Sequence, residues 1–273
     1  MRTKIRIAGS NSLKLLLGGK TMVVINGKVY SGNVTIVNGR VVGGDSNNSS
    51  SDKKVDERKC ERSEGIRRIG IRSNVPVKVS AEKCKNVEAH LHGTFVGDGN
   101  PNLSVTRSEN KILIVAEVDD NGNSISIFSS NSVIINNCGN TGGLNLDVIL
   151  PEEMFEEISI ESKNDNVNVT SSVNANEIKV DCKNGNVDVY ATFQQSTIDC
   201  KNGNINVISE AQSDVRLDIT SKNGNVNVSV RNIGTSNVYV ASKNGCCKNN
   251  PRLRGKHTAY GNITTKNGNV KFE

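Results

Sequence analysis

The sequence predicts an all-β protein, a parallel β-solenoid like a single-stranded β-helix, whose coils of about 18–23 residues turn at Asn-Gly pairs. One observation is a string of the form Ser/Cys/Thr-Lys-Asn-Gly-Asn-Val/Ile, which recurs in six copies at spacings of 20, 18, 21, 21 and 23 residues, the first with Asp in place of Gly and the fifth broken after Gly. The other is the alternation of apolar and polar residues on both sides of the string. A repeat of this length is typical of stacked coils, and a period of two is typical of strands. The six strings begin at Ser162, Cys182, Cys200, Ser221, Ser242 and Thr265.

Each copy reads as a strand, an Asn-Gly turn and a second strand. The residue two places before each string is β-branched and apolar, as a buried strand position prefers. We expect these residues to form one buried column, because like side chains of neighbouring parallel strands lie about 4.8 Å apart. The column consists of Ile160, Val180, Ile198, Ile219, Val240 and Ile263.

The turn residues have a structural role in this interpretation. Asn and Gly tolerate positive φ, so an Asn-Gly pair between alternating strands also favours a hairpin, and an antiparallel meander is the alternative fold. Identical columns at a near-constant period favour the parallel stack. The predicted turn residues are Asn184, Gly185, Asn202, Gly203, Asn223, Gly224, Asn267 and Gly268.

Ahead of the repeats the chain divides into three shorter segments. Residues 1–21 are expected to be an N-terminal extension, although Met22 is an alternative start, and residues 22–44 to form a small β-hairpin segment around two Asn-Gly pairs. Residues 45–64 are rich in Ser, Asn and charge and predict a flexible linker. Gly19-Lys20-Thr21 resembles the end of a phosphate-binding loop, but Lys14 stands where the first glycine is required, so no nucleotide site is predicted.

Residues 65–273 are expected to form one continuous β domain, with irregular coils over 65–160 and regular ones over 161–273. Between these parts, PEEMFEEI at residues 151–158 has Pro at a permissive first position followed by acids, which favours one short helical turn.

Composition excludes several classes of function. Aromatic residues make up 3% of the chain and Trp is absent, so there are few platforms for stacking on bases, and the formal charge of +6 falls short of a nucleic-acid footprint. No apolar run approaches 18 residues and no convincing signal peptide is present. Seven cysteines without paired spacing favour a reducing compartment. Together these features predict a location in the cytoplasm or peripheral to the cell envelope.

No metal or cofactor is predicted. Cys182 and Cys200 occupy a column filled elsewhere by Ser or Thr, so we expect free, small, buried residues. His90 and His92 share one face of a strand but lack a third ligand at a supporting spacing. The adjacent Cys246 and Cys247 with the remote His257 are not a recognised zinc spacing either.

The best candidates for catalysis are acids in the repeats. Some parallel β-helices act on polysaccharides with carboxylates on one flank, and Glu161, Asp181, Asp199 and Asp188 could serve in this way. Each lies close in sequence to a Lys of the repeat, which indicates charge balance along the stack. No Ser-His-Asp arrangement or phosphate loop is present, so we predict no catalytic residue and no enzyme. A glycan-binding or polysaccharide-acting protein is the alternative, and acids gathered in a cleft would favour it.

The order of four segments carries a resemblance to a known family. EGIRRIGIRSNVPVKVS, KILIVAEV, LNLDVILPEEMFEEISIES and the repeated Ser/Cys-Lys-Asn-Gly-Asn-Val-x-Val resemble the bacterial putative-adhesin family of β-strand-repeat proteins, over about residues 65–273. The resemblance implies a parallel β-solenoid, no established enzymatic activity and, in some members, a link to the envelope stress response. It therefore predicts a non-enzymatic interaction module or envelope-associated scaffold, whose partner is a protein or a second copy of the chain.

The fifth copy breaks off after Gly245 and continues as CCKNNPRLRGKH. We expect a lost strand and a protruding loop, because Pro251 and Gly255 disfavour a strand. The loop carries cations without an acid, which makes it a candidate to bind an anionic phospholipid head group or a polyanionic envelope polymer, and a solvated insertion without a partner is the alternative. The residues of this candidate site are Lys248, Arg252, Arg254, Lys256 and His257.

The last copy ends directly at Glu273. Stacked coils need caps, because a bare end exposes unpaired backbone and an apolar edge. We therefore expect this end to be covered by a partner, by a second copy of the chain or by the N-terminal hairpins.

Overall fold

The computed structural model describes residues 53–95, 100–118 and 143–273 in full, and from residues 1–52 only the strands β1–β5. The described residues contain strands and no helix, which confirms the all-β prediction. The chain divides into two units. The first comprises Met1–Lys53, Thr94–Asn100 and Asp119–Gly142, and the second comprises Lys54–Gly93, Pro101–Val118 and Gly143–Glu273.

The first unit contains an antiparallel sheet of five strands in the order β1-β2-β4-β3, with β5 pairing β4. Two of its strands come from the predicted extension 1–21. The Asn-Gly pairs at 26–27 and 38–39 and Gly19-Lys20-Thr21 lie outside the described residues. The strands are β1 (Lys4–Ile7), β2 (Ser12–Leu16), β3 (Met22–Ile25), β4 (Lys28–Val37) and β5 (Arg40–Ser46).

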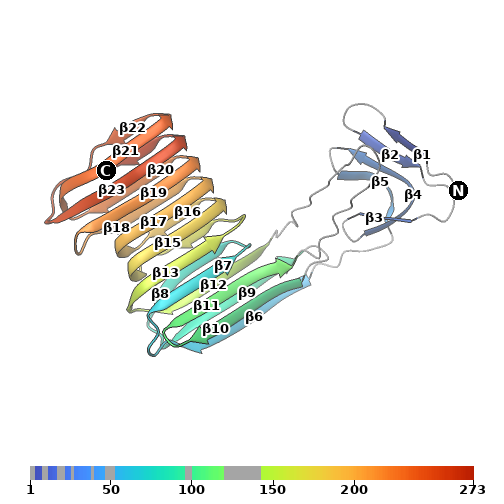
Figure 1. The fold of residues 1–273 in the computed structure, drawn as a ribbon. Helices are drawn as coiled ribbons and strands as arrows, with labels where there is room; N and C mark the ends of the chain where they lie inside the picture. Colours follow the sequence, from blue (N-terminus) through green and yellow to red (C-terminus); the bar gives the residue numbers. More distant parts are fainter. Residues whose placement is uncertain are drawn as a thin grey trace. The chain divides into compact units, whose positions relative to one another are not determined.

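The second unit consists of two mixed sheets in which most strands are parallel (Figure 1). Sheet I has nine strands, in the order β10 (Asn100–Ser108), β11 (Lys111–Asp119), β7 (Arg68–Ser73), β13 (Met154–Ser162), β15 (Asn174–Asn184), β17 (Thr192–Asn202), β19 (Val215–Asn223), β23 (His257–Asn267) and β21 (Ile233–Asn244). Sheet II has ten, in the order β22 (Cys247–Asn249), β24 (Val270–Phe272), β20 (Val226–Arg231), β18 (Ile205–Glu210), β16 (Val187–Tyr190), β14 (Val167–Val169), β8 (Val77–Glu82), β12 (Leu144–Pro151), β9 (Asn86–Phe95) and β6 (Lys53–Arg62).

From β13 onward the chain alternates between the sheets, so that each repeat places one strand in sheet I and the next in sheet II. Neighbouring repeats pair in parallel and in register, with Cys182 opposite Cys200 and Asn184 opposite Asn202. The antiparallel meander does not form over β13–β24.

The order of the last two repeats in space is the reverse of their order in the sequence. Strand β23 lies between β19 and β21, and β24 lies between β20 and β22. The sixth copy therefore stacks on the fourth, and the broken fifth copy is at the end of both sheets. The sixth copy has Val270 and Phe272 at positions where the fifth has Cys247 and Asn249. Burying the apolar pair and leaving the polar pair at the exposed end is the favourable arrangement.

The predicted column forms, with its last two members exchanged. Ile219 pairs with Ile263, which pairs with Val240. All members are buried except Val240, which is half-buried because its strand is the edge of the sheet. Ile71 and Ile114 of the irregular part continue the column on the other side of Ile160.

Three local predictions need correction. Residues 53–62 of the predicted linker form the edge strand β6, because a strand at a sheet edge tolerates charged side chains on its exposed positions. The predicted helical turn at 151–158 is instead the last residue of β12, a bend at 152–153 and the start of β13. The apolar residues of β13 alternate inward, and its pairing with β7 and β15 overrides the local signal. The strand expected to be lost after Gly245 is present as the short β22.

The chain end is also placed differently from the prediction. Glu273 follows β24, which is flanked by β20 and β22 rather than lying at the bare end of a stack.

Candidate binding surface at the basic end of the sheets

The turns between the sheets are held by a ladder of asparagine side chains. The Nδ2 of each Asn donates a hydrogen bond to the Oδ1 of the Asn in the repeat that precedes it in space, at 2.7–2.9 Å. Repeated amide ladders of this kind add to the cohesion of stacked strands. In spatial order the members are Asn164, Asn184, Asn202, Asn223, Asn267 and Asn244.

A second ladder runs two residues further along the turn. Each Asn Oδ1 accepts a hydrogen bond from the backbone N–H of the matching residue in the next coil, at 2.8–3.0 Å. It ends at Cys246, which has no carboxamide oxygen to offer a further coil. The members are Asn166, Asn186, Asn204, Asn225 and Asn269.

The terminal repeat β21–β22 closes the sheets with polar groups. Asn249 occupies the inward column that holds Val228 and Phe272 in the preceding repeats. Its Nδ2 donates a 3.3 Å hydrogen bond to the carbonyl oxygen of Val238, which is buried. The broken copy thus acts as a cap for the apolar interior. The sequence did not indicate this role, because in the sequence the broken copy lies between two complete copies and not at the end.

The candidate residues of the broken copy gather at this end, which we call the basic end. Lys248 lies in β22, His257 begins β23, and Arg252, Arg254 and Lys256 lie in the segment between these strands. The four cations are exposed and His257 is half-buried.

The fold adds two groups to the basic end that sequence reasoning missed. Lys271 is the register partner of Lys248, and its Nζ lies 2.5 Å from the Glu273 carboxylate. The hydrogen bond with Lys271 and the charges of Lys271, Arg252 and Lys248 lower the pKa of Glu273. The sequence did contain a signal for these two groups, because Val270 and Phe272 match the apolar residues of the other repeats and so place Lys271 in a strand. That this strand lies beside Lys248 follows only from the pairing of copies five and six.

Apolar side chains accompany these cations. Of the four large hydrophobic residues that are exposed in the described part of the chain, Tyr239, Leu253 and Tyr260 belong to the last two repeats. Leu253 stands between Arg252 and Arg254 and is 50% exposed.

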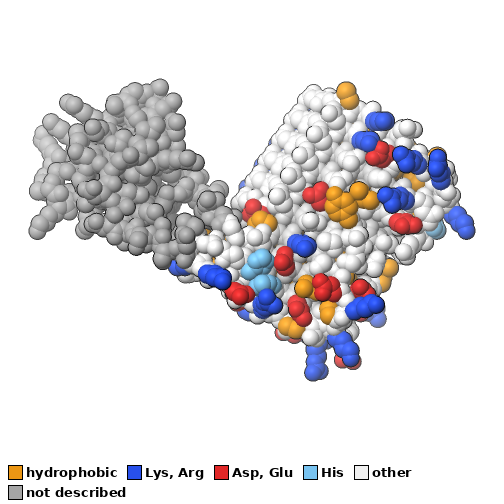
Figure 2. Space-filling view, turned by 180° about the vertical axis from the view of Figure 1, so that it is seen from behind, with side chains coloured by type: hydrophobic (Ala, Val, Ile, Leu, Met, Phe, Trp, Pro, Cys, Tyr) orange, Lys and Arg blue, Asp and Glu red, His pale blue; other side chains and the backbone are white. Residues whose placement is uncertain are grey.

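Charge is segregated along the second unit. Residues 215–273 contain ten Lys and Arg and two acids, whereas residues 143–214 contain four Lys and thirteen acids. Both acids of the basic segment are ion-paired, Asp218 with Arg216 at 2.7 Å and Glu273 with Lys271. In Figure 2, Lys and Arg side chains lie among few acidic ones toward the end at which Figure 1 marks the C-terminus, whereas basic and acidic side chains are mixed at the other end of the second unit.

Three of the acids considered for catalysis form one column on the outer face of sheet I, because Glu161 is the register partner of Asp181 and Asp181 that of Asp199. All three are exposed, and Glu161 is ion-paired with Arg72 at 2.9 Å. Asp188 lies in sheet II.

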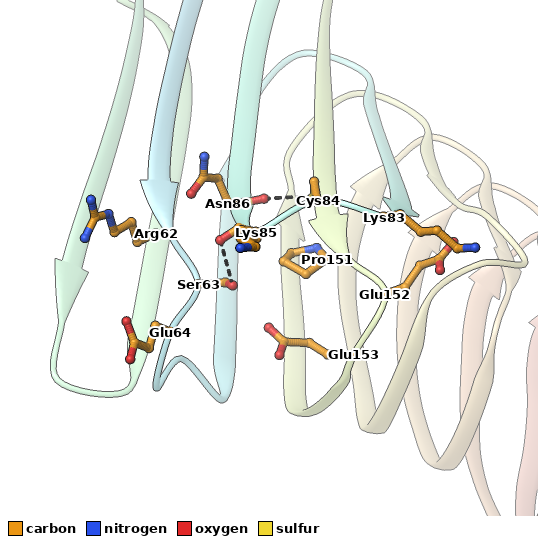
Figure 3. A pocket seen from close by; sticks show the side chains of 10 residues that line it. All are labelled: Arg62, Ser63, Glu64, Lys83, Cys84, Lys85, Asn86, Pro151, Glu152 and Glu153. Carbon is orange, nitrogen blue, oxygen red and sulfur yellow. Dashed lines mark hydrogen bonds between the residues drawn. The ribbon is translucent and has the colours of Figure 1, made fainter.

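A hollow of about 930 Å³ lies elsewhere in the second unit (Figure 3). It combines three glutamates with three basic residues, and none of the acids predicted as catalytic candidates lines it. Its lining is Arg62, Ser63, Glu64, Lys83, Cys84, Lys85, Asn86, Pro151, Glu152 and Glu153.

The histidines of the AHLHG segment pair with acids. The ring centroids of His90 and His92 are 4.5 Å apart, His90 Nε2 lies 2.7 Å from Asp56, and His92 Nε2 lies 3.1 Å from Asp147. Within the described residues, no group of three or more His, Cys, Asp or Glu side chains is arranged to hold a metal ion.

The described cysteines are free thiols. Cys182 and Cys200 are buried, as expected, whereas Cys246 and Cys247 are exposed at the basic end. Cys138 lies outside the described residues.

The described residues include no helix long and apolar enough to cross a membrane.

No protein-family model matches this chain, and a search of curated proteins gives no match. Two of the solved structures that resemble this chain are described as adhesion proteins. One is a putative cell adhesion protein from Clostridium sporogenes, with 13% identity, coverage of 81% of this chain and 99% of that chain, and a TM-score of 0.48. The other is a putative adhesin from Bacteroides fragilis, with 13% identity, coverage of 82% and 99%, and a TM-score of 0.33.

Proposed function

We propose that the protein is a non-enzymatic interaction module, an adhesin-like or envelope-associated scaffold, whose strand pairs are the coils of a parallel β-solenoid. Its basic end binds an anionic surface, either phospholipid head groups or a polyanionic envelope polymer. The supporting observation is the charge segregation. Eight of the ten cations in residues 215–273 have no ion-pair partner among the described residues, while the acids lie in the preceding segment.

The energetics favour a salt-sensitive contact. A basic side chain near an anionic membrane contributes about 1 kcal/mol, so the four cations of the basic end contribute about 4 kcal/mol. Leu253, Tyr239 and Tyr260 suit the boundary between head groups and acyl chains. The same cations also discourage pairing of the edge strands β21 and β22 with other strands. If the cations served only to prevent such strand pairing, the basic end would bind no anionic ligand.

Sedimentation with vesicles tests the proposal. The natural chain is expected to sediment with vesicles containing phosphatidylglycerol at low salt, and less at physiological salt, because exposed charges are screened. Changing Lys248, Arg252, Arg254 and Lys256 together to Ser should abolish most of this binding.

The matched control changes four exposed cations of the edge strand β6 to Ser and should retain binding. These are Lys53, Lys54, Arg58 and Arg62. Equal binding by both variants, or no binding by the natural chain, contradicts the assignment of the basic end.

A further inference from the structure

A row of six lysines follows the turns between the two sheets. Each lysine stands between a small residue that is paired in register and an Asn of the ladder, so all six occupy the same position in successive repeats. Strands in a sheet are about 4.8 Å apart, so the row spans about 24 Å. In spatial order the row consists of Lys163, Lys183, Lys201, Lys222, Lys266 and Lys243.

All six side chains are exposed, and within the described residues none of them forms an ion pair. Acids stand two residues before the first three lysines, at Glu161, Asp181 and Asp199. The last three lysines have Thr220, Thr264 and Ala241 at the equivalent positions, so no acid compensates this half of the row.

The other residues of the repeated string have structural explanations. The first Asn builds one ladder and the second Asn builds the other. A Cβ on Gly203 would lie 1.9 Å from the carbonyl oxygen of Gly185, so the glycine is required by close packing of the turns. The small residue bonds a turn carbonyl, as Ser162 does at 2.8 Å. Only the lysine side chain has, within the described residues, no hydrogen bond or ion pair that would explain its presence in every copy.

Stacked like charges are also unfavourable to the fold, because equal charges on directly opposite strand positions repel. A chain with regularly repeated negative charges, lying across the turns along the row, would neutralise several lysines at once and release their counterions. No exposed aromatic side chain belongs to the described turn residues, so stacking on bases contributes nothing there.

We propose that the lysine row binds a linear polyphosphate-type polyanion, a chain of repeated phosphate groups without bases. This site is separate from the basic end, and the proposal does not rest on that surface binding a membrane. Contact with several lysines at once predicts that affinity increases with the length of the polyanion and falls steeply with salt.

Binding of long-chain inorganic polyphosphate and of tripolyphosphate, measured by calorimetry over a series of salt concentrations, tests the row. The natural chain should bind the long polymer more tightly. Changing Lys201, Lys222 and Lys266 to Ser should lower the affinity about tenfold or more and reduce the salt slope by about two to three. These lysines have no partner to lose, so an unchanged or higher melting temperature will show that the variant is folded.

The matched control changes Lys248, Arg252 and Arg254 of the basic end to Ser and should keep the length-dependent binding. This control also separates the two proposals, because a failure of vesicle binding would contradict only the proposal for the basic end. Equal affinity and salt slope for the lysine-row variant and the natural chain would overturn the site. Equal binding of tripolyphosphate and the long polymer, or tighter binding of single-stranded oligothymidylate with the same number of phosphates, would overturn the proposed ligand.

Discussion

The column of small residues before the lysines shows why Ser, Thr and Cys are interchangeable there. Ser242 Oγ donates a 2.7 Å hydrogen bond to the carbonyl oxygen of Gly268, and Thr265 Oγ1 donates a 3.0 Å bond to that of Gly224. The thiol of Cys200 lies 3.4 Å from the carbonyl oxygen of Gly185. The hydrogen bond with Cys200 and burial raise the pKa of the Cys182 thiol. The Cys182 thiol therefore stays protonated.

Replacing Cys182 and Cys200 together by Ser should change the free energy of unfolding by about 1 kcal/mol or less, because Ser makes the same bond in neighbouring coils. Replacing both by Ala should cost about 1–3 kcal/mol, since turn carbonyls lose a donor. Urea denaturation under reducing conditions measures both changes. A serine variant that is less stable than the alanine variant would refute the role given to these side chains.

Glycine is required for different reasons at two positions. A Cβ on Gly203 would collide with the backbone of the preceding turn, whereas Gly65 has a φ of +77° and nothing within 4 Å of an added Cβ. We expect Gly203→Ala to cost about 3 kcal/mol through overpacking and Gly65→Ala about 1 kcal/mol through backbone strain. Thermal unfolding of the two variants compares their losses of stability directly. Equal losses would show that neighbouring turns can move apart to make room for the added Cβ of residue 203.

At the scale of elements, the exchanged order of the last repeats determines which strands are edges. Strands β21 and β22 are bonded on one side only, while β23 and β24, although last in the chain, are bonded on both sides. Edge strands open more readily than internal ones.

Hydrogen exchange should therefore protect the backbone amides of His257–Asn267 more strongly than those of Ile233–Asn244. Mass spectrometry of peptides from the two segments, in the natural chain at neutral pH, provides the measurement. The internal strand β19 is the control and should resemble β23. Faster exchange in 257–267 than in 233–244 would mean that the copies stack in the order of the sequence.

At the scale of the whole molecule, ion pairs between strands make stability depend on pH. The hydrogen bond from Arg67 and the charges of Arg67 and Arg68 lower the pKa of Glu156, which joins β13 to the segment leading into β7. A carboxylate with a lowered folded pKa contributes stability above its unfolded pKa of about 4.3, and this contribution is lost as the pH falls through the folded value.

We expect the urea midpoint to fall between about pH 5 and pH 3. Glu156→Gln should lower the midpoint at pH 7 and should bring it closer to that of the natural chain at pH 3. Glu153→Gln is the control, because Glu153 has no ion pair within the described residues. A constant difference between natural chain and Gln variant across this range would exclude the carboxylate as the cause.

Much of the repeat region could be predicted from sequence because its determinants are local. The alternation around Val180 and Cys182 specifies a strand, the Asn-Gly pairs specify turns, and matching residues at a constant period specify parallel register. The candidate cations were also identifiable, since Lys248 and Arg252 lie in a segment without acids.

The sequence by itself therefore determined the all-β class, the turns, the buried column and the pairing of equivalent residues in neighbouring repeats. Only the tertiary structure decided that the sixth copy lies between the fourth and fifth, that Lys271 and Glu273 join the basic end, and that residues 53–62 form an edge strand. The physical reason is that repeats with the same register can pair with one another in any order. The choice among orders depends on burying Val270 and Phe272 while exposing Cys247 and Asn249, and burial is a property of the assembled sheets.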